Sequence, residues 1–401
     1  MAIFPNKKKH IEILFLSLLF TSCFGLILLN FRIFKYLFTL ILFSFCLIKS
    51  KSIPCKKAIL CYALSVGGSC VYSAVCNHQN FIKVIGNSYT YWSLLFVFIT
   101  MSYKPTANQI EKVIKYLSIT FCLCYLTQWA IYPTAIFTGG LDDLNISNDI
   151  FRMRMPGSIC AYCLFFYGVN KYILHKRKSD LLYALLGFLP IIIMGFRSLV
   201  AATALFAMIM IPFVTKSITK TFVWLAVGGA VLIGVSQLNI VQTKLDEMME
   251  RQESGQTFNN EDYIRFLAYE YFDESIFIKP GERFFGGGVP VEGTSAYYRN
   301  MTDAVERLHF FWTDLGLIGL SYIIGIPAVL LLVGIVLYCI HQTKLEHMQY
   351  IRFTLLTVLL GSIMTSMELF RTGNILIISL YLCLIYTVSK ESRLPCKNIV
   401  K

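Results

Sequence analysis

Long apolar runs separated by short polar stretches dominate the chain. Runs of about 17 to 22 residues are long enough to cross a hydrocarbon core of roughly 30 Å as helices. We therefore predict an all-α polytopic membrane protein with about twelve spans, in a single domain covering residues 1–401. The predicted spans are 11–29, 33–48, 58–76, 85–101, 116–133, 158–174, 181–195, 198–214, 221–238, 313–340, 353–369 and 374–388.

Two longer polar segments, 134–157 and 239–308, interrupt this pattern. The second separates the ninth and tenth spans and holds 13 of the 23 acidic residues. Within it, residues 261–277 carry apolar side chains at helical spacing, and residues 281–293 are typical of turns. The following span, 313–340, is long and contains a proline at position 327, which predicts a tilt or a kink.

The distribution of positive charge predicts the orientation of the spans. The net charge of +13 raises the alternative of nucleic-acid binding, but the lysines and arginines fall in short clusters at every second loop. That is the pattern in which cytoplasmic loops are positive. We therefore expect both termini in the cytoplasm, no nucleic-acid partner, and both long polar segments outside, including the large external loop 239–308.

Arg197 is the first candidate for chemistry, in the sequence Gly195-Phe196-Arg197-Ser198 at the predicted external side. Its guanidinium group can hold a phosphate through two parallel hydrogen bonds, and we expect Ser198 to cap the next helix. The alternative is an arginine that turns a tight helical hairpin and extends to the membrane interface.

Glu368 and Arg371 form the second candidate, because residues three apart can face the same way on a helix. They are either a structural ion pair or a functional pair, in which the carboxylate supports a substrate-binding arginine or acts as a base. His309, directly before the tenth span, is the third candidate. A histidine there can orient an acceptor or relay a proton near neutral pH.

The large external loop contains further candidates. Arg265 lies on the polar face of the predicted helix, and Arg283 precedes a run of three glycines centred on Gly287. Backbone N–H groups in such a run can approach an anion. The run lacks the Lys-Ser/Thr ending of a nucleotide-binding loop. With no metal motif either, we expect neither a metal nor a cofactor.

In order and spacing, these features resemble the O-antigen polymerase and ligase superfamily, which are GT-C-like membrane glycosyltransferases. The family has an Arg-Ser step at the outer end of paired helices, matched here by Arg197-Ser198. It has an external loop whose early helix carries an arginine ahead of a Gly-x-Gly turn, here Arg265 and 286–288. A histidine then precedes a Gly-Leu-Ile-Gly run, here His309 and residues 316–319. The resemblance covers the C-terminal half, whereas residues 1–180 match only in hydropathy.

The resemblance implies a polymerase of undecaprenyl-diphosphate-linked oligosaccharide repeat units, acting at the periplasmic face of the bacterial inner membrane to make O-antigen or capsular polysaccharide. It implies an inverting, metal-independent mechanism in which Arg197 and Arg265 stabilise the departing diphosphate. The base is His309 or a loop carboxylate such as Glu261 or Asp262. The implied partners are the lipid-linked donor and acceptor, the lipid bilayer and a chain-length regulator. An O-antigen ligase and a transporter or flippase of lipid-linked sugars are the alternatives.

Overall fold

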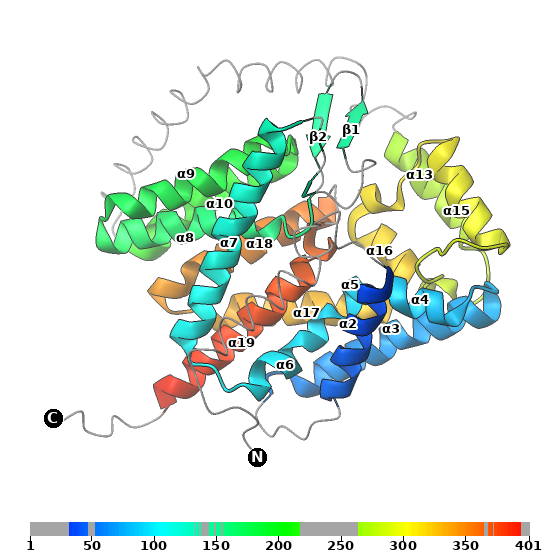
Figure 1. Cartoon of the computed structure of the whole chain (residues 1–401), viewed down its shortest axis with the longest axis horizontal. Helices are drawn as coiled ribbons and strands as arrows, with labels where there is room; N and C mark the ends of the chain where they lie inside the picture. The colour runs from blue at the N-terminus through cyan, green and yellow to red at the C-terminus, as the bar shows by residue number, and fades with distance from the viewer. Residues whose placement is uncertain are drawn as a thin grey trace.

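The regular structure is helical apart from one short ribbon of two strands (Figure 1). The structure, a computed structural model, describes residues 32–46, 53–132, 134, 136–137, 144–147, 150–153, 155–216, 264–364, 368–371 and 373–393. Within these residues, α3 (Lys56–Cys76) and the stretches Ser198–Thr215 and Asn374–Ser392 are long and apolar enough to cross a membrane. The predicted class of helical membrane protein is therefore supported. The predicted spans 11–29 and 221–238 lie outside the described residues.

The N-terminal part of the chain forms six helical elements, four of which make up a bent pair. The elements are α2 (Arg32–Cys46), α3, α4 (Phe81–Asn87), α5 (Tyr89–Trp92), η2 (Ser93–Leu95) and α6 (Phe96–Ser102). Asn80 caps α4 by accepting a hydrogen bond from the backbone N–H of Lys83. The predicted span 85–101 is this pair, bent by 57° between α4 and the stretch Tyr89–Ser102.

Helix α7 (Ala107–Ala130) begins with a capping box of Thr106 and Gln109. Three helices with close backbone contacts follow it. They are α8 (Ile159–His175), α9 (Lys178–Ile193) and α10 (Arg197–Thr215), with the ribbon β1 (Leu144–Ser147) and β2 (Ile150–Met153) between α7 and α8. Gly168 and Gly187 let α8 and α9 approach closely. A Cβ atom on Gly168 would lie 2.3 Å from the backbone nitrogen of Ala184.

The C-terminal half consists of short helices in the large loop, then longer ones. They are α13 (Ile264–Tyr271), the π-helix η4 (Phe272–Ile276), α14 (Glu282–Phe285), α15 (Ala296–Glu306), η5 (Trp312–Leu315), α16 (Gly316–Ile324), α17 (Ile326–Gln342), η6 (Glu346–Met348), α18 (Gln349–Met364), η7 (Glu368–Phe370) and α19 (Asn374–Arg393). The predicted span 313–340 is interrupted, but the break lies at Gly325 rather than at Pro327. Gly325, with φ of 82°, separates α16 from α17, and Pro327 lies in the first turn of α17.

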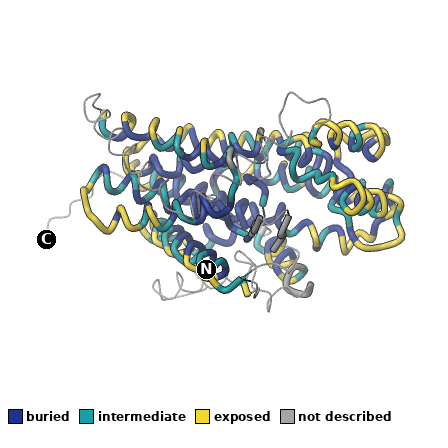
Figure 2. Tube along the Cα trace, turned by 90° about the horizontal axis from the view of Figure 1, so that it is seen from above, coloured by how far each residue is buried: buried dark blue, intermediate teal, exposed yellow. Residues whose placement is uncertain are grey.

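Helix α19 is the most enclosed of the long apolar helices. Two thirds of its most apolar stretch (67%) is buried, against one third (33%) in α3 and in α10. The buried residues accordingly concentrate inside the molecule, and exposed ones follow the outer faces of the helices (Figure 2). Helix α19 is therefore mostly enclosed by other helices, whereas α3 and α10 leave more of their apolar residues exposed.

Candidate functional site

The predicted pair Glu368 and Arg371 forms the centre of a buried polar cluster. Arg371 Nη1 lies 2.9 Å from Glu368 Oε1, and this contact is an ion pair without the alignment of a hydrogen bond. Ser158 Oγ donates a hydrogen bond of 2.5 Å to Glu368 Oε2. The Glu368 side chain is fully buried, whereas one fifth (20%) of the Arg371 side chain is exposed. The carboxylate is therefore held in place, and part of the guanidinium remains accessible.

Asn374 completes this cluster. Its side-chain amide donates to Ser158 Oγ at 3.1 Å and to the carbonyl of Glu368, and its Oδ1 accepts from the N–H of Ile159 at 3.1 Å. We name Ser158, Glu368, Arg371 and Asn374 the carboxylate cluster. It joins the start of α8 to the start of α19 through buried hydrogen bonds, each of which contributes about 1 kcal/mol. The sequence analysis missed Ser158 and Asn374, although polar residues at helix starts are a recognisable signal.

The carboxylate cluster contacts the start of α10, where Arg197 lies. The guanidinium carbon of Arg371 is 4.8 Å from the centre of the Phe196 ring, a cation–π distance. Phe196 precedes the first residue of α10, which is Arg197 itself. The Arg197 side chain lies outside the described residues, but its backbone position beside the cluster is defined.

The prediction that Ser198 caps α10 is wrong. The capping position belongs to Phe196, whose side chain makes no capping hydrogen bond, so Ser198 lies inside the first turn. Gly195, with φ of 70°, reverses the chain early enough for the helix to start before Ser198. Ser198 can still face a ligand from that first turn.

Arg265 and His309 lie on elements that connect to the carboxylate cluster through packing. Helix α13, which carries Arg265, contacts η5, and Tyr271 at its end packs against Phe310 with ring centres 5.7 Å apart. His309 is exposed and has φ of 55°, so the chain turns sharply there between α15 and η5. The predicted bases Glu261 and Asp262 lie outside the described residues.

A glycine contact links η5 to the carboxylate cluster. A Cβ atom on Gly316, directly after η5, would lie 2.3 Å from the carbonyl oxygen of Ser362 near the end of α18. Ser362 Oγ in turn accepts a hydrogen bond of 2.7 Å from the N–H of Leu369, next to Glu368. These two contacts therefore join the residue that follows η5 to the carboxylate cluster.

Arg283 and Gly287 serve the packing of the loop itself. Arg283 forms an ion pair of 2.7 Å with Asp273 of η4. The N–H of Gly287 donates to the carbonyl of Tyr322 at 2.7 Å, and the N–H of Gly288 donates to that of Ile323 at 3.0 Å. These N–H groups are therefore committed to the end of α16 rather than directed at an anion, and described contacts do not bring either Arg283 or Gly287 to the carboxylate cluster.

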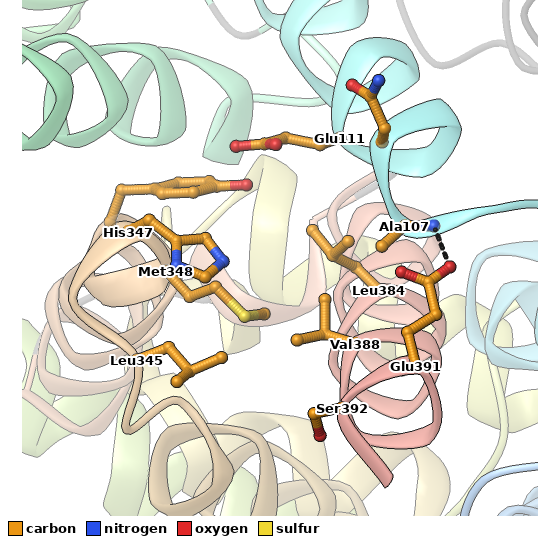
Figure 3. A pocket seen from close by; sticks show the side chains of 11 residues that line it. Ala107, Glu111, Leu345, His347, Met348, Leu384, Val388, Glu391 and Ser392 are labelled. Atoms are coloured by element: carbon orange, nitrogen blue, oxygen red, sulfur yellow. Dashed lines mark hydrogen bonds between the residues drawn. The ribbon is translucent and has the colours of Figure 1, made fainter. Parts of the chain in front are cut away.

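A separate pocket of about 440 Å³ lies at the other end of α19 (Figure 3). Its apolar side includes Leu384 and Val388, and its polar side includes Glu111, His347 and Glu391. Glu391 accepts a hydrogen bond of 3.1 Å from the N–H of Ala107 at the start of α7. Along α19 the pocket residues begin at Leu384 and end at Ser392, so at 1.5 Å per residue they lie about 15–27 Å from Asn374 of the carboxylate cluster. The pocket contains none of the predicted site residues.

Within the part of the chain that the structure describes, no three His, Cys, Asp or Glu side chains come together as a metal site would require. The chain matches no protein-family model, and no curated protein matches it. Fold and site thus define the chain as a helical protein with helices long and apolar enough to cross a membrane, and with a buried Glu–Arg cluster at one end of the bundle.

Proposed function

We propose that this protein is a polytopic glycosyltransferase that polymerises undecaprenyl-diphosphate-linked oligosaccharide repeat units at the outer face of the bacterial inner membrane. The observation that carries the proposal is the contact between Arg371 and Phe196, which puts one arginine directly against the residue before another, Arg197. Two arginines at adjacent helix ends, one of them held by a buried carboxylate, suit a ligand that carries two phosphates.

The arrangement of helix ends supports a site that faces outward. Ten of the twelve predicted spans coincide with helices or helix pairs in the described residues, and the other two lie outside them. If the twelve spans alternate from a cytoplasmic N-terminus, the starts of α8, α10 and α19 and the end of α18 all lie outside. The carboxylate cluster draws its members from those ends, next to the large external loop.

The proposed reaction exchanges one bond at the anomeric carbon of the donor. A hydroxyl oxygen of the acceptor sugar forms a bond to that carbon from the face opposite the diphosphate. The carbon–oxygen bond to the diphosphate breaks, and undecaprenyl diphosphate leaves with the electron pair. Arg197 and Arg265 stabilise the charge that develops on it. The hydroxyl proton passes to a base, for which exposed His309 is the described candidate.

In this proposal Glu368 positions Arg371, and Arg371 holds the non-reacting phosphate or a sugar hydroxyl. The buried carboxylate, itself held by the hydrogen bond from Ser158, gives the Arg371 guanidinium a fixed ionic partner. Fixed donors contribute more to charge stabilisation than donors that must reorganise when charge develops. The ligase alternative differs only in its acceptor.

A transporter of lipid-linked sugars is the second candidate, and broken helices favour it. Helix α4 meets the following stretch at 57°, and α16 and α17 are separated at Gly325. Transporters commonly build their substrate sites from interrupted helices. The polymerase remains the preferred proposal because the charged cluster lies at helix ends rather than at their middles.

The test compares arginine variants in cells that make the glycan. Arg197→Ala and Arg265→Ala should each abolish chain elongation at unchanged protein abundance, leaving single repeat units on the carrier lipid at the periplasmic face. Arg307→Ala is the matched control, because Arg307 is exposed and pairs only loosely with Asp303, at 3.7 Å. Full-length polymer in both variants would exclude the mechanism, and repeat units retained on the cytoplasmic face would identify a transporter.

A further inference from the structure

Part of the large loop packs along the side of α3 rather than above it. The ring of Phe285 lies 3.5 Å from where a Cβ atom on Gly68 would be, and it stacks on Tyr72 with ring centres 5.8 Å apart. Gly68 is eight residues before Cys76, the last residue of α3. At 1.5 Å per residue, the Phe285 ring therefore reaches about 12 Å below the end of that helix.

Polar contacts fix the top of this segment at the end of α3. Lys279 Nζ donates to the carbonyl of Cys76 and to Asn77 Oδ1, both at 2.7 Å. The hydroxyl of Tyr72 donates to the carbonyl of Pro280 at 2.8 Å. Beyond these contacts the segment runs along α3 away from the end of that helix. It comes back to this end at Gly287, whose carbonyl accepts a hydrogen bond of 3.1 Å from Asn77 Nδ2.

The aromatic residues at the lowest point are exposed on a face that is already apolar. Phe284 is 58% and Phe285 is 43% exposed. Leu64, Val71 and Val75 are the exposed apolar residues of α3. Together with Gly68 their spacing of four, three and four residues puts them on one side of the helix. Phe285 thus continues the outward-facing apolar stripe of α3.

Helix α17 provides a second apolar stripe beside the same segment. Helix α14, which holds Phe284 and Phe285, contacts both α3 and α17. Ile326, Leu330 and Leu337 are exposed on α17 at spacings of four and seven residues. In a chain whose α3 crosses a membrane, hydrocarbon is the surroundings that such stripes require.

We infer that residues 280–288 form a re-entrant wedge that enters the outer half of the bilayer beside α3, with the rings of Phe284 and Phe285 in contact with phospholipid acyl chains. Irregular backbone at that depth must form hydrogen bonds within the protein, and much of this segment does: the N–H groups of Phe284 and Phe285 donate to the carbonyl of Gly281, and that of Gly286 donates to Glu282. The N–H groups of Gly287 and Gly288 bond to the carbonyls of Tyr322 and Ile323. The wedge revises the expectation that 239–308 is external throughout, and it does not depend on the proposed glycosyl transfer.

The test replaces single residues of the full-length chain with the photoreactive amino acid p-benzoylphenylalanine, in nanodiscs of phosphatidylethanolamine and phosphatidylglycerol. Phe284 is the test position. Leu64, 76% exposed on α3, is the lipid-facing control, and Glu306, exposed at the end of α15, is the water-facing control. A matching size-exclusion profile for each variant shows that it is folded.

We expect irradiation to attach phospholipid at position 284 with a yield like that at 64 and well above that at 306. A yield at 284 that matches 306 would overturn the inference, because the segment would then lie in water. Covalent dimers without lipid adducts at 284 would also overturn it, because a second copy of the chain would cover the patch. The nanodiscs contain no polyprenyl lipids. If an adduct at position 284 formed only after polyprenyl lipids were added to them, the inference would be overturned, because the rings would then contact the polyprenyl chain of a substrate rather than phospholipid.

Discussion

Arg371 lies over the ring of Phe196 and at the same time pairs with the buried carboxylate of Glu368. One side chain therefore connects the start of α10 to the turn between α18 and α19. Phe196 and Arg371 are 175 positions apart in the sequence, and this side-chain contact joins them.

Arg371→Met should destabilise the protein by about 3 kcal/mol, because removing one partner leaves a buried charge without compensation. The free energy of unfolding in detergent, titrated with a denaturing surfactant, measures the loss. The double variant Glu368→Gln/Arg371→Met should recover most of it, because the amide keeps the hydrogen bond from Ser158 without the charge. A double variant as unstable as the single one would contradict the ion-pair interpretation.

Asn374→Ala should cost about 1–3 kcal/mol, since it leaves the buried N–H of Ile159 and the hydroxyl of Ser158 without an amide partner. The same unfolding titration measures the change. Asn108→Ala is the matched control, because Asn108 is exposed near the start of α7. Equal losses in the two variants would show that the carboxylate cluster does not hold α8 and α19 together.

Gly286→Ala should destabilise the protein by more than about 1 kcal/mol, since an L side chain is strained at positive φ. Gly286 has φ of 81°, and its Cβ atom would lie 2.5 Å from the backbone nitrogen of Gly325. Gly334→Ala, in the middle of α17, meets nothing within 4 Å and should be neutral or stabilising. Thermal unfolding of both variants distinguishes a packing position from an open one, and a neutral Gly286→Ala would show that the loop can shift.

His347→Gln should flatten the pH dependence of stability below pH 6.5. Burial lowers the pKa of His347 from that ordinary value, and the charge of Lys171 lowers it further against the opposing effect of Glu111. The unfolded chain therefore binds a proton that the folded chain does not, so stability falls as the pH falls from 6.5 toward the lowered pKa.

The measurement for His347 is the midpoint of thermal unfolding at several pH values. His341→Gln provides the control, because His341 is exposed at the end of α17. A flattened slope in His347→Gln that His341→Gln does not reproduce would assign the acid sensitivity to His347. Unchanged slopes in both variants would mean that another group is responsible for the acid sensitivity.

Apolar periodicity predicted the helices well, because the length of an apolar run and the places where it breaks are local properties. Pro327 indicated an interruption in the span 313–340 in this way, although the break itself lies at Gly325, where φ is 82°. The pairing of Glu368 with Arg371 was also accessible, because three residues separate them. Contacts between distant residues were not accessible. Ser158 bonds to Glu368 across 210 positions, and only the fold shows that they meet.

The glycine run illustrates the opposite error. A run of three glycines predicts close approach to the backbone but not the identity of what approaches. At 286–288 the approaching groups are the carbonyls of Tyr322 and Ile323 and the backbone around Gly325, rather than an anion. The Ser198 cap failed for a related reason, since the start of α10 depends on the turn at Gly195 and not on the best capping residue nearby.

The break at Gly325 also bears on the order in which the chain is assembled. Ending α16 there would leave carbonyls without helical partners. The Ile323 carbonyl accepts from Gly288 and also from Ser69 Oγ at 2.6 Å, and the Tyr322 carbonyl accepts from Gly287. Those donors come from the loop and from α3, both made earlier than α16 during synthesis. These bonds of the loop therefore cannot form until the later helix has been made.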